Sequence, residues 1–167
     1  MDVLLPALRI ATALACGLMG GLFFIFSNTV MAALARLQPA EGIAAMQSIN
    51  RVILNPLFLG IFLATPAACA LVILASVWGG SEPGAARLIA GAALYIAGTF
   101  LVTMLANVPM NNALDSSHPA TTEAAALWSR YLVDWTRWNH VRTVTSLLAA
   151  TLLTVGLYLG ARAPSGG

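Results

Sequence analysis

The chain is 167 residues long, 59% hydrophobic and only 8% charged, with a formal net charge of +2 and no lysine. Its mean hydropathy of +0.85 is far above that of an ordinary soluble domain of this length. The composition predicts an integral, multi-pass membrane protein in contact with the lipid bilayer. It excludes the basic surface that binding of nucleic acid requires.

Four apolar stretches are long enough to cross a hydrocarbon core of about 30 Å at about 1.5 Å per residue. They are residues 10–34, 52–78, 85–106 and 141–161. Each is predicted to be a helix, because a lone strand cannot satisfy its backbone in lipid. Short connections favour an all-α, up-down-up-down bundle of four transmembrane helices in one domain, residues 1–162, with a disordered tail at 163–167. We expect a bacterial cell membrane, in an orientation left open because arginines lie on both sides.

The first two connections are short. Residues 38–50 contain proline and glutamate near their start and are predicted to form a short interfacial helix up to Ile49. The sequence Ser-Glu-Pro-Gly at 81–84 predicts a tight turn between the second and third helices.

The third connection is longer and is predicted to contain a helix of its own. Pro119 follows a run of polar residues that stops the third helix, and Thr121 or Thr122 can cap a new helix that runs toward Trp138. An amphipathic helical segment is therefore expected to lead into the last transmembrane helix.

Residues that often bind metals are few. Cys16 and Cys69 both fall inside predicted spans, where they are expected to be small packing residues and not a disulfide. His118 and His140 have no close cysteine or histidine partner in the sequence. We therefore expect no metal site and no cofactor.

Small residues indicate where two helices approach closely. They recur every four positions in the first helix and again near the end of the chain: Ala13, Gly17 and Gly21, then Gly156 and Gly160. Because close helix packing in lipid favours such residues, the first and last helices are predicted to be in contact.

Polar residues collect at one end of the predicted bundle. In an antiparallel arrangement the ends of helices one and three meet the beginnings of helices two and four. These four places contain Ser27, Asn28 and Thr29; Asn50, Arg51 and Asn55; Asn107, Asn111 and Asn112; and Trp135, Trp138, Asn139 and Arg142. This asymmetry is the strongest indication of function in the sequence.

Helical spacing arranges these residues into stripes, at about 100° per residue. One stripe of the last helix contains Trp128, Tyr131, Trp135, Trp138 and Arg142, with Asn139 at its edge. A second, on helix two, contains Arg51, Asn55, Phe58, Phe62 and Thr65. Together with Asn107 and Asn111, one turn apart, they predict a pocket with an aromatic and amide mouth, two guanidinium groups and a phenylalanine floor. His140 projects nearly opposite Arg142.

Simpler explanations exist for several of these residues. Trp128 and Tyr131 could be interfacial anchors of a helix lying on the bilayer. Asn28 and Asn112, taken singly, are typical of helix caps, and Arg130 with Asp134 is typical of an ion pair one turn apart. Amides and a guanidinium inside the hydrocarbon region are nevertheless costly unless they satisfy one another or a ligand.

Four short motifs resemble the anthrone oxygenase family of small four-helix membrane proteins. They are Asn-Val-Pro-Met-Asn at 107–111, the pattern WxxWNxVRT at 135–143, FSNTVMAAL at 26–34, and Asn-Pro at 55–56. The motifs extend over nearly the whole chain.

The resemblance implies a cofactor-independent oxidation of an anthrone-like polyphenol to a quinone by molecular oxygen, with a lipophilic aromatic small molecule as the ligand. It gives catalytic roles to Arg142, which holds the enolate oxygen, and to Asn139, Asn107 and Asn111, which orient phenolic groups and peroxide. Substrate binding is expected from Trp135, Trp138, Tyr131, Asn55, Arg51, Phe58, Phe62 and Asn28. The general base is left open between Asp134, His140 and none.

Two other classes of function compete with this one. A non-catalytic membrane protein would bind a quinone or dock a partner subunit through the same polar end. A small-molecule transporter would work as a dimer, the kind of homo-oligomer that four helices permit, but no acidic residue for ion coupling lies in a predicted span. We rank the enzyme first, the binding protein second and the transporter third.

Overall fold

The computed structural model of the protein describes residues 3–80 and 82–162. Ser81 in the predicted turn and the predicted tail at 163–167 lie outside these residues. Within them the structure has helices and no strand, and four helical runs are long and apolar enough to cross a membrane: Leu4–Leu34, Pro56–Trp78, Ala85–Asp115 and Thr122–Ala161. The prediction of an all-α fold with four membrane-spanning helices is confirmed.

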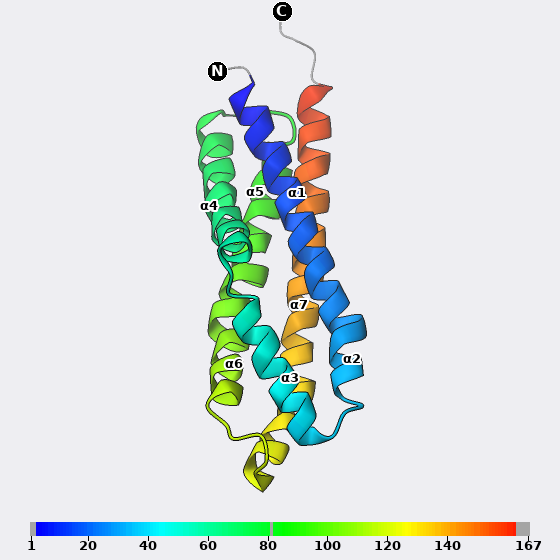
Figure 1. The fold of residues 1–167 in the computed structure, drawn as a ribbon. Helices are drawn as coiled ribbons and strands as arrows, with labels where there is room; N and C mark the ends of the chain where they lie inside the picture. Colours follow the sequence, from blue (N-terminus) through cyan, green and yellow to red (C-terminus); the bar gives the residue numbers. More distant parts are fainter. Residues whose placement is uncertain (1–2, 81, 163–167) are drawn as a thin grey trace, which may run out of the picture.

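Ten helical elements follow one another in the described ranges. They are α1 (Leu4–Ile25), the π-helical turn η1 (Phe26–Val30), α2 (Met31–Leu34), α3 (Pro39–Val52), α4 (Pro56–Trp78), α5 (Ala85–Tyr95), the π-helical turns η2 (Ile96–Leu101) and η3 (Thr103–Asn107), α6 (Val108–Asp115) and α7 (Thr122–Ala161). The start of α1, the end of α7 and the α4–α5 connection lie at one end of the bundle, whereas the α2–α3 and α6–α7 connections lie at the other (Figure 1).

Exposed apolar side chains indicate where the bilayer surrounds the bundle. Large ones run along α1 from Leu4 to Ile25 and along α4 from Leu57 to Trp78, and on α7 they include Trp138 and Tyr158. Each of these stretches is about 30 Å long at about 1.5 Å per residue, the thickness of a hydrocarbon core. A hydrocarbon core of this thickness fitted to these stretches has Trp78 and Tyr158 at one boundary and Trp138 at the other, where interfacial aromatic residues are typically found.

The second span differs from the prediction at its start. Residues 53–55 are not helical, and α4 begins at Pro56 instead of continuing from residue 52. Proline disfavours helix at the preceding residue, and the Asn55 side chain accepts a hydrogen bond from the Phe58 amide at 3.0 Å, which caps α4. Arg51 and Asn55 consequently belong to different elements and do not share one helical stripe.

The short helix of the first connection, α3, packs one face against the bundle and leaves the other exposed. Ile43 and Met46 are fully buried against α6 and α7. Gln47 donates hydrogen bonds to the backbone oxygens of Leu114 at 2.8 Å, near the end of α6, and of Ser117 at 3.0 Å, just after it. The predicted short helix of the first connection is therefore present, and one of its faces packs against α6 and α7.

The helix predicted after Pro119 is present as the first half of α7, which runs without a break through 40 residues. Thr121 is its N-cap and accepts a hydrogen bond from the Ala124 amide at 3.2 Å. Trp128 and Tyr131 are buried, with 3% and 2% of their surfaces exposed, and pack against α2, α3 and α6. The alternative that they anchor a helix lying on the bilayer is therefore wrong.

The first and last transmembrane helices do pack closely, although through partly different residues than predicted. An added methyl group at Gly20 would meet the side chain and backbone of Leu147, whereas Gly21 faces open space. Gly156 packs against Leu88 and Gly84 at the start of the third span, and not against α1. Cys16 and Cys69 are buried free thiols in the core, as predicted.

A substitution at Gly84 tests the α5–α7 contact. Gly84 has a φ of +93°, and a Cβ there would collide with the backbone oxygen of Gly156. We expect Gly84→Ala to lower the free energy of unfolding by about 3 kcal/mol or more, since neither backbone can move away cheaply. The matched control is Gly80→Ala, where φ is +75° but no atom lies within 4 Å, so only the backbone strain of about 1–2 kcal/mol applies. Equal losses in thermal unfolding in detergent would contradict the close contact.

Candidate functional site

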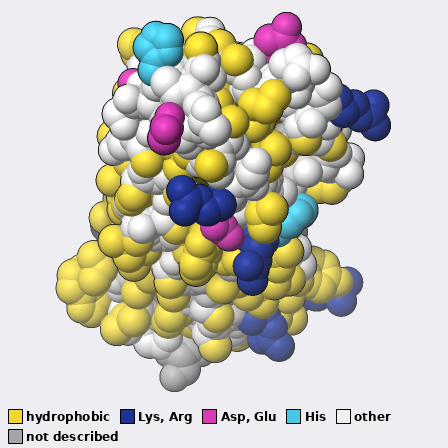
Figure 2. All heavy atoms as spheres, turned by 90° about the horizontal axis from the view of Figure 1, so that it is seen from below, with side chains coloured by type: hydrophobic (Ala, Val, Ile, Leu, Met, Phe, Trp, Pro, Cys, Tyr) yellow, Lys and Arg dark blue, Asp and Glu magenta, His cyan; other side chains and the backbone are white. Residues whose placement is uncertain are grey.

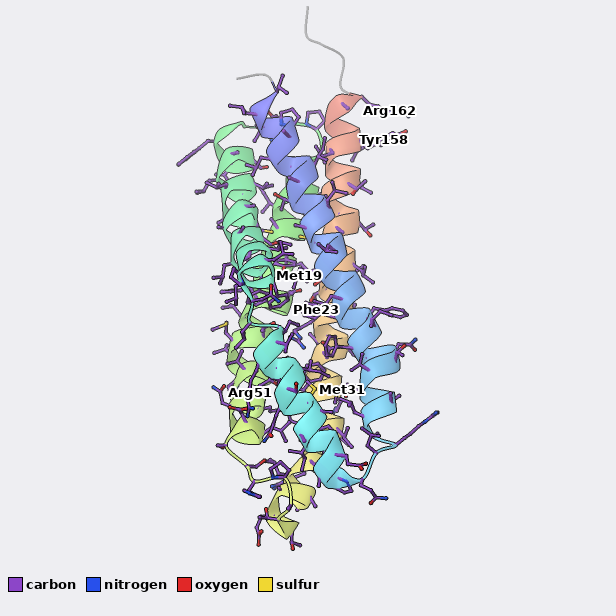
Figure 3. All side chains as sticks on the ribbon, viewed as in Figure 1. Met19, Phe23, Met31, Arg51, Tyr158 and Arg162 are labelled. Atoms are coloured by element: carbon purple, nitrogen blue, oxygen red, sulfur yellow. The ribbon has the colours of Figure 1, made fainter. Side chains whose placement is uncertain are left out.

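Arg142 is the centre of the polar cluster inside the bundle. It lies one turn of α7 inside the boundary marked by Trp138, and only 5% of its surface is exposed. Its guanidinium donates hydrogen bonds to the Asn139 side chain at 2.6 Å and to the Thr103 hydroxyl at 3.3 Å. The Phe23 and Trp135 rings lie 4.3 and 5.1 Å from its central carbon. Figure 3 shows Phe23 at the middle of the bundle, on α1.

The charge of Arg142 is not neutralised by a carboxylate. In the described part of the chain the ion pairs are Arg9–Glu82 and Arg51–Asp115, and neither includes Arg142. Its Nε is buried and has no hydrogen-bond partner among the described residues. A buried guanidinium held only by an amide, a hydroxyl and ring faces retains most of its capacity to bind an anion.

Asn139 connects Arg142 to α1. Its amide nitrogen donates to the Phe23 carbonyl at 2.6 Å and to the Ser27 hydroxyl, and its oxygen accepts from Arg142. The side chain is completely buried. Ser27 lies in the π-helical turn η1, a type of irregularity that is frequent at functional sites. Asn139 thus fixes the position of the guanidinium relative to α1.

Asn107 and Asn111 position Trp135 from the other side of the bundle. The Asn111 oxygen accepts hydrogen bonds from the Tyr131 hydroxyl at 2.7 Å and the Trp135 indole nitrogen at 2.8 Å. Asn107 donates to the Trp135 carbonyl at 3.2 Å, and its own oxygen is buried without a partner among the described residues. Tyr131 stacks between Trp128 and Trp135, with ring centroids 5.6 and 5.9 Å apart. Trp135 is therefore held rigidly.

A cavity of about 360 Å³ lies beside these residues, within the range of small-molecule sites. Its walls come from α1 and η1, the end of α3, the start of α4, η3, α6 and α7. Arg142 and Trp135 line one part, and Phe58 and Phe62, stacked at 5.7 Å, line another. A largely apolar cavity with a buried cation at one place suits a flat aromatic molecule with a negatively charged oxygen.

The cavity brings together six of the twelve predicted site residues. Its lining includes Arg142, Trp135, Asn111, Arg51, Phe58 and Phe62. Three more lie directly behind the lining and hold it in place: Asn139, Asn107 and Tyr131. Tyr131 thus supports Asn111 and Trp135 from behind the lining, and its predicted contact with substrate stays a prediction.

The remaining three predicted residues neither line this cavity nor hydrogen-bond to a residue of its lining as Asn139, Asn107 and Tyr131 do. Trp138 is 45% exposed, because a continuous helix turns Asn139 inward and leaves its neighbour at the membrane boundary. Asn55 is exposed and caps α4, and Asn28 is exposed on η1. The simpler explanation of an asparagine as a helix cap thus holds for Asn55.

The two residues that the sequence offers as a general base, Asp134 and His140, both point away from the cavity. Asp134 and His140 are exposed on α7, and neither lines the cavity. Asp134 also forms no ion pair with Arg130 within the described ranges, contrary to the prediction. Both orientations follow from the phase of α7, which directs Trp135, Asn139 and Arg142 inward.

Sequence reasoning missed Phe23, Thr103 and Asp115 in the cavity lining. Thr103 stands four residues before Asn107, so the helical spacing could have included it. Asp115 begins the polar run that stops the predicted third helix, which gives it a simple local explanation. Phe23 looks like any other apolar residue of the first span, so no local signal distinguishes Phe23.

Removing the Asn111 side chain tests how Trp135 is held. We expect Asn111→Ala to lower the free energy of unfolding by about 2–4 kcal/mol, because a buried phenol and a buried indole N–H each lose their acceptor. The neighbouring Asn112 is exposed, and Asn112→Ala should change the free energy of unfolding by less than about 0.5 kcal/mol. Thermal unfolding in detergent measures both, and an unchanged Asn111→Ala protein would refute the two hydrogen bonds.

The structure defines a class of protein: a helical membrane protein in which four helical runs are long and apolar enough to cross a bilayer. Among its described residues, a cavity lies next to a buried arginine that has no carboxylate partner. Comparison with protein families gives a match to anthrone oxygenase over residues 55–152, more than half of the chain. The chain belongs to the anthrone oxygenase family. No curated protein and no solved structure matches it. The matched region runs from the start of α4 into α7 and includes Arg142, Asn139, Asn107 and Asn111.

Proposed function

We propose that the protein oxidises an anthrone-like polyphenol to the corresponding quinone with molecular oxygen and without a cofactor. The observation that supports this most is the guanidinium of Arg142 in the cavity wall, buried and without a carboxylate partner in the described chain. Membership in the family supports an oxygenase-like role. An anionic, flat aromatic intermediate is the species that this cavity would stabilise best.

The reaction needs no electron carrier. The ring methylene of an anthrone loses a proton to give an enolate, whose negative charge lies largely on the carbonyl oxygen. One electron passes from this anion to oxygen, and the resulting radical and superoxide combine to a peroxide anion at the former methylene carbon. This anion takes up a proton, which replaces the one lost in the first step, and becomes a hydroperoxide. Loss of water breaks the O–O bond and leaves a second carbonyl group. One anthrone and one O₂ therefore give one quinone and one water.

In this scheme the side chains stabilise the charge of the enolate and position the aromatic rings of the substrate. Arg142 binds the enolate oxygen, which lowers the free energy of the anion relative to the neutral anthrone. Trp135, held by Asn111, provides a face for the aromatic rings, and Phe58 and Phe62 cover the rest. Asp134 and His140 point away from the cavity, and the lining carboxylate of Asp115 is paired with Arg51, so the proton passes to water at the mouth.

An oxidation assay tests the proposal. Protein purified in detergent, supplied with an anthrone, should raise the rate of quinone formation above that in detergent alone, with one O₂ consumed per quinone. A chelator should not change this rate, and metal analysis of active protein should find no stoichiometric iron, copper or haem. Bound anthrone recovered unchanged would instead favour the binding-protein alternative, and loss of activity with the chelator would refute the cofactor-independent mechanism.

A further inference from the structure

The rim of the cavity has two edges of opposite character. Arg51 and Asp115 form an ion pair in the lining, with 65% and 49% of their side chains exposed, and make up the charged edge. Leu63 and Met104 also line the cavity, and they are 55% and 44% exposed. A side chain that lines a cavity and is about half exposed lies at its rim. Leu63 and Met104 therefore form an apolar edge.

The apolar edge lies at the depth of the hydrocarbon core. Leu63 stands six residues after Leu57, where the exposed apolar belt of α4 begins, and thus about 9 Å farther along the helix. Met104 follows Thr103, whose hydroxyl accepts a hydrogen bond from Arg142, inside the same boundary. By contrast, basic and acidic side chains lie scattered among apolar ones on the end of the bundle that Figure 2 shows. The apolar edge consequently faces lipid chains.

This part of the rim lies between the second and third spans. Over the first part of the third span, α4 packs against α5 and η2. Where the span continues into the π-helical turn η3, the two runs both face the cavity, with Phe62 and Leu63 from α4 and Thr103 and Met104 from η3. Irregular turns of this type are frequent at functional sites. The cavity therefore opens sideways between α4 and η3.

The apolar edge is the nearer of the two to Arg142. Met104 is adjacent to Thr103, which contacts the guanidinium, whereas Asp115 lies about three helical turns farther along the same run, on the order of 18 Å along its axis. A molecule dissolved in the bilayer can thus reach Arg142 without crossing the headgroup region. It must be uncharged on the way, because neither lipid chains nor the apolar edge compensates an ion for its lost hydration.

We infer that the cavity takes its ligand sideways from the hydrocarbon core, between α4 and η3 and past Leu63 and Met104, as an uncharged planar aromatic molecule. The negative charge then forms only beside Arg142. The charged edge has a separate role, since it admits the water that takes up the proton. The inference rests on the proposed function for the identity of the ligand, whereas the route itself would serve a binding protein equally.

Rates of ligand binding test this route without requiring oxidation. Protein in lipid nanodiscs is mixed with anthraquinone, which is neutral and already oxidised, and quenching of tryptophan fluorescence is followed by stopped flow. Trp135→Phe gives the quenching that arises outside the cavity. We expect the double variant Leu63→Phe, Met104→Phe to lower the association and dissociation rate constants about tenfold each and to change Kd less than about twofold, because a narrower entrance raises the barrier in both directions. Leu63→Ala should raise both rate constants.

The matched controls add the same bulk at other exposed leucines. Leu57→Phe and Leu105→Phe lie on the same two helical runs, at positions outside the cavity lining. Leu54→Phe lies in the lining, three residues after Arg51, and narrows the charged edge. All three should bind anthraquinone with wild-type rate constants.

A permanently charged ligand tests the route from the aqueous side. Arg142 attracts an anthraquinone sulfonate, but the hydrocarbon core excludes this ion. We expect its association rate constant to be at least about tenfold below that of anthraquinone. Faster binding of the sulfonate, no binding of anthraquinone, slower rates in Leu54→Phe but not in the double variant, or an effect of the double variant on dissociation alone would overturn the route.

The route and the proposed reaction can fail separately. A protein that oxidises anthrone, but whose double variant binds anthraquinone with wild-type rate constants, refutes the lateral route alone. A protein that shows the expected rate changes but no oxidation refutes the proposed reaction and leaves the route standing.

Discussion

Replacing Arg142 by methionine is expected to abolish oxidation of anthrone while the protein stays folded. The guanidinium is the cation that the cavity holds next to Trp135, and methionine has a similar length without charge. Loss of one such stabilising group in other enzymes costs on the order of 10²–10³-fold in turnover. The measurement is the rate of quinone formation, corrected for the rate in detergent without protein. Size-exclusion chromatography and thermal unfolding establish that the variant is folded.

Arg142→Lys sharpens this test because it keeps the charge. Arg142 contacts Asn139 and Thr103 through two different nitrogens of its planar guanidinium. The lysine ammonium is a single nitrogen on a shorter side chain, and it cannot make both contacts and still bind the ligand. We expect a loss of at least about tenfold in turnover. The matched control is Arg137→Met, on the exposed face of the same helix, which should retain activity. Wild-type rates in Arg142→Met would refute the assigned role.

Asn139→Leu is expected to have the second largest effect on turnover. Leucine cannot donate to the Phe23 carbonyl and Ser27, and it removes the 2.6 Å hydrogen bond that holds the guanidinium. Asn139 acts through Arg142 and is a positioning residue. We expect a loss of about tenfold to a hundredfold in turnover, and a decrease of about 1–3 kcal/mol in the free energy of unfolding, since a buried carbonyl loses its partner.

Asn139→Asp separates positioning from simple destabilisation. A carboxylate there would lie against the guanidinium and neutralise it, so an ionised hydroxyanthraquinone should bind more weakly while a neutral anthraquinone binds as before. Asn28→Leu, at an exposed position of η1, is the control for an asparagine outside the cavity and should keep both affinities. If Asn139→Asp weakened both ligands equally, Asn139 would have a structural role only.

Much of the fold could be predicted because it depends on local properties of the chain. The number of spans follows from the length of apolar stretches, since a helix must bury its backbone polar groups wherever it meets lipid. The helix after Pro119 follows from a capping threonine, which acts within one turn. Arg142 could be predicted to face the interior, because a guanidinium inside the hydrocarbon region must find polar partners.

The sequence alone therefore determined the class of fold, the polar end of the bundle and most of the residues around Arg142. Tertiary structure decided what depends on the relative rotation and position of helices, which no local pattern contains. It placed Asn139 inside and Trp138 outside, made Tyr131 a support for Trp135, and separated Arg51 from Asn55 by the break before Pro56. It also brought Asp115 to Arg51, 64 residues away in sequence, because only the packing of α3 on α6 brings those two side chains together.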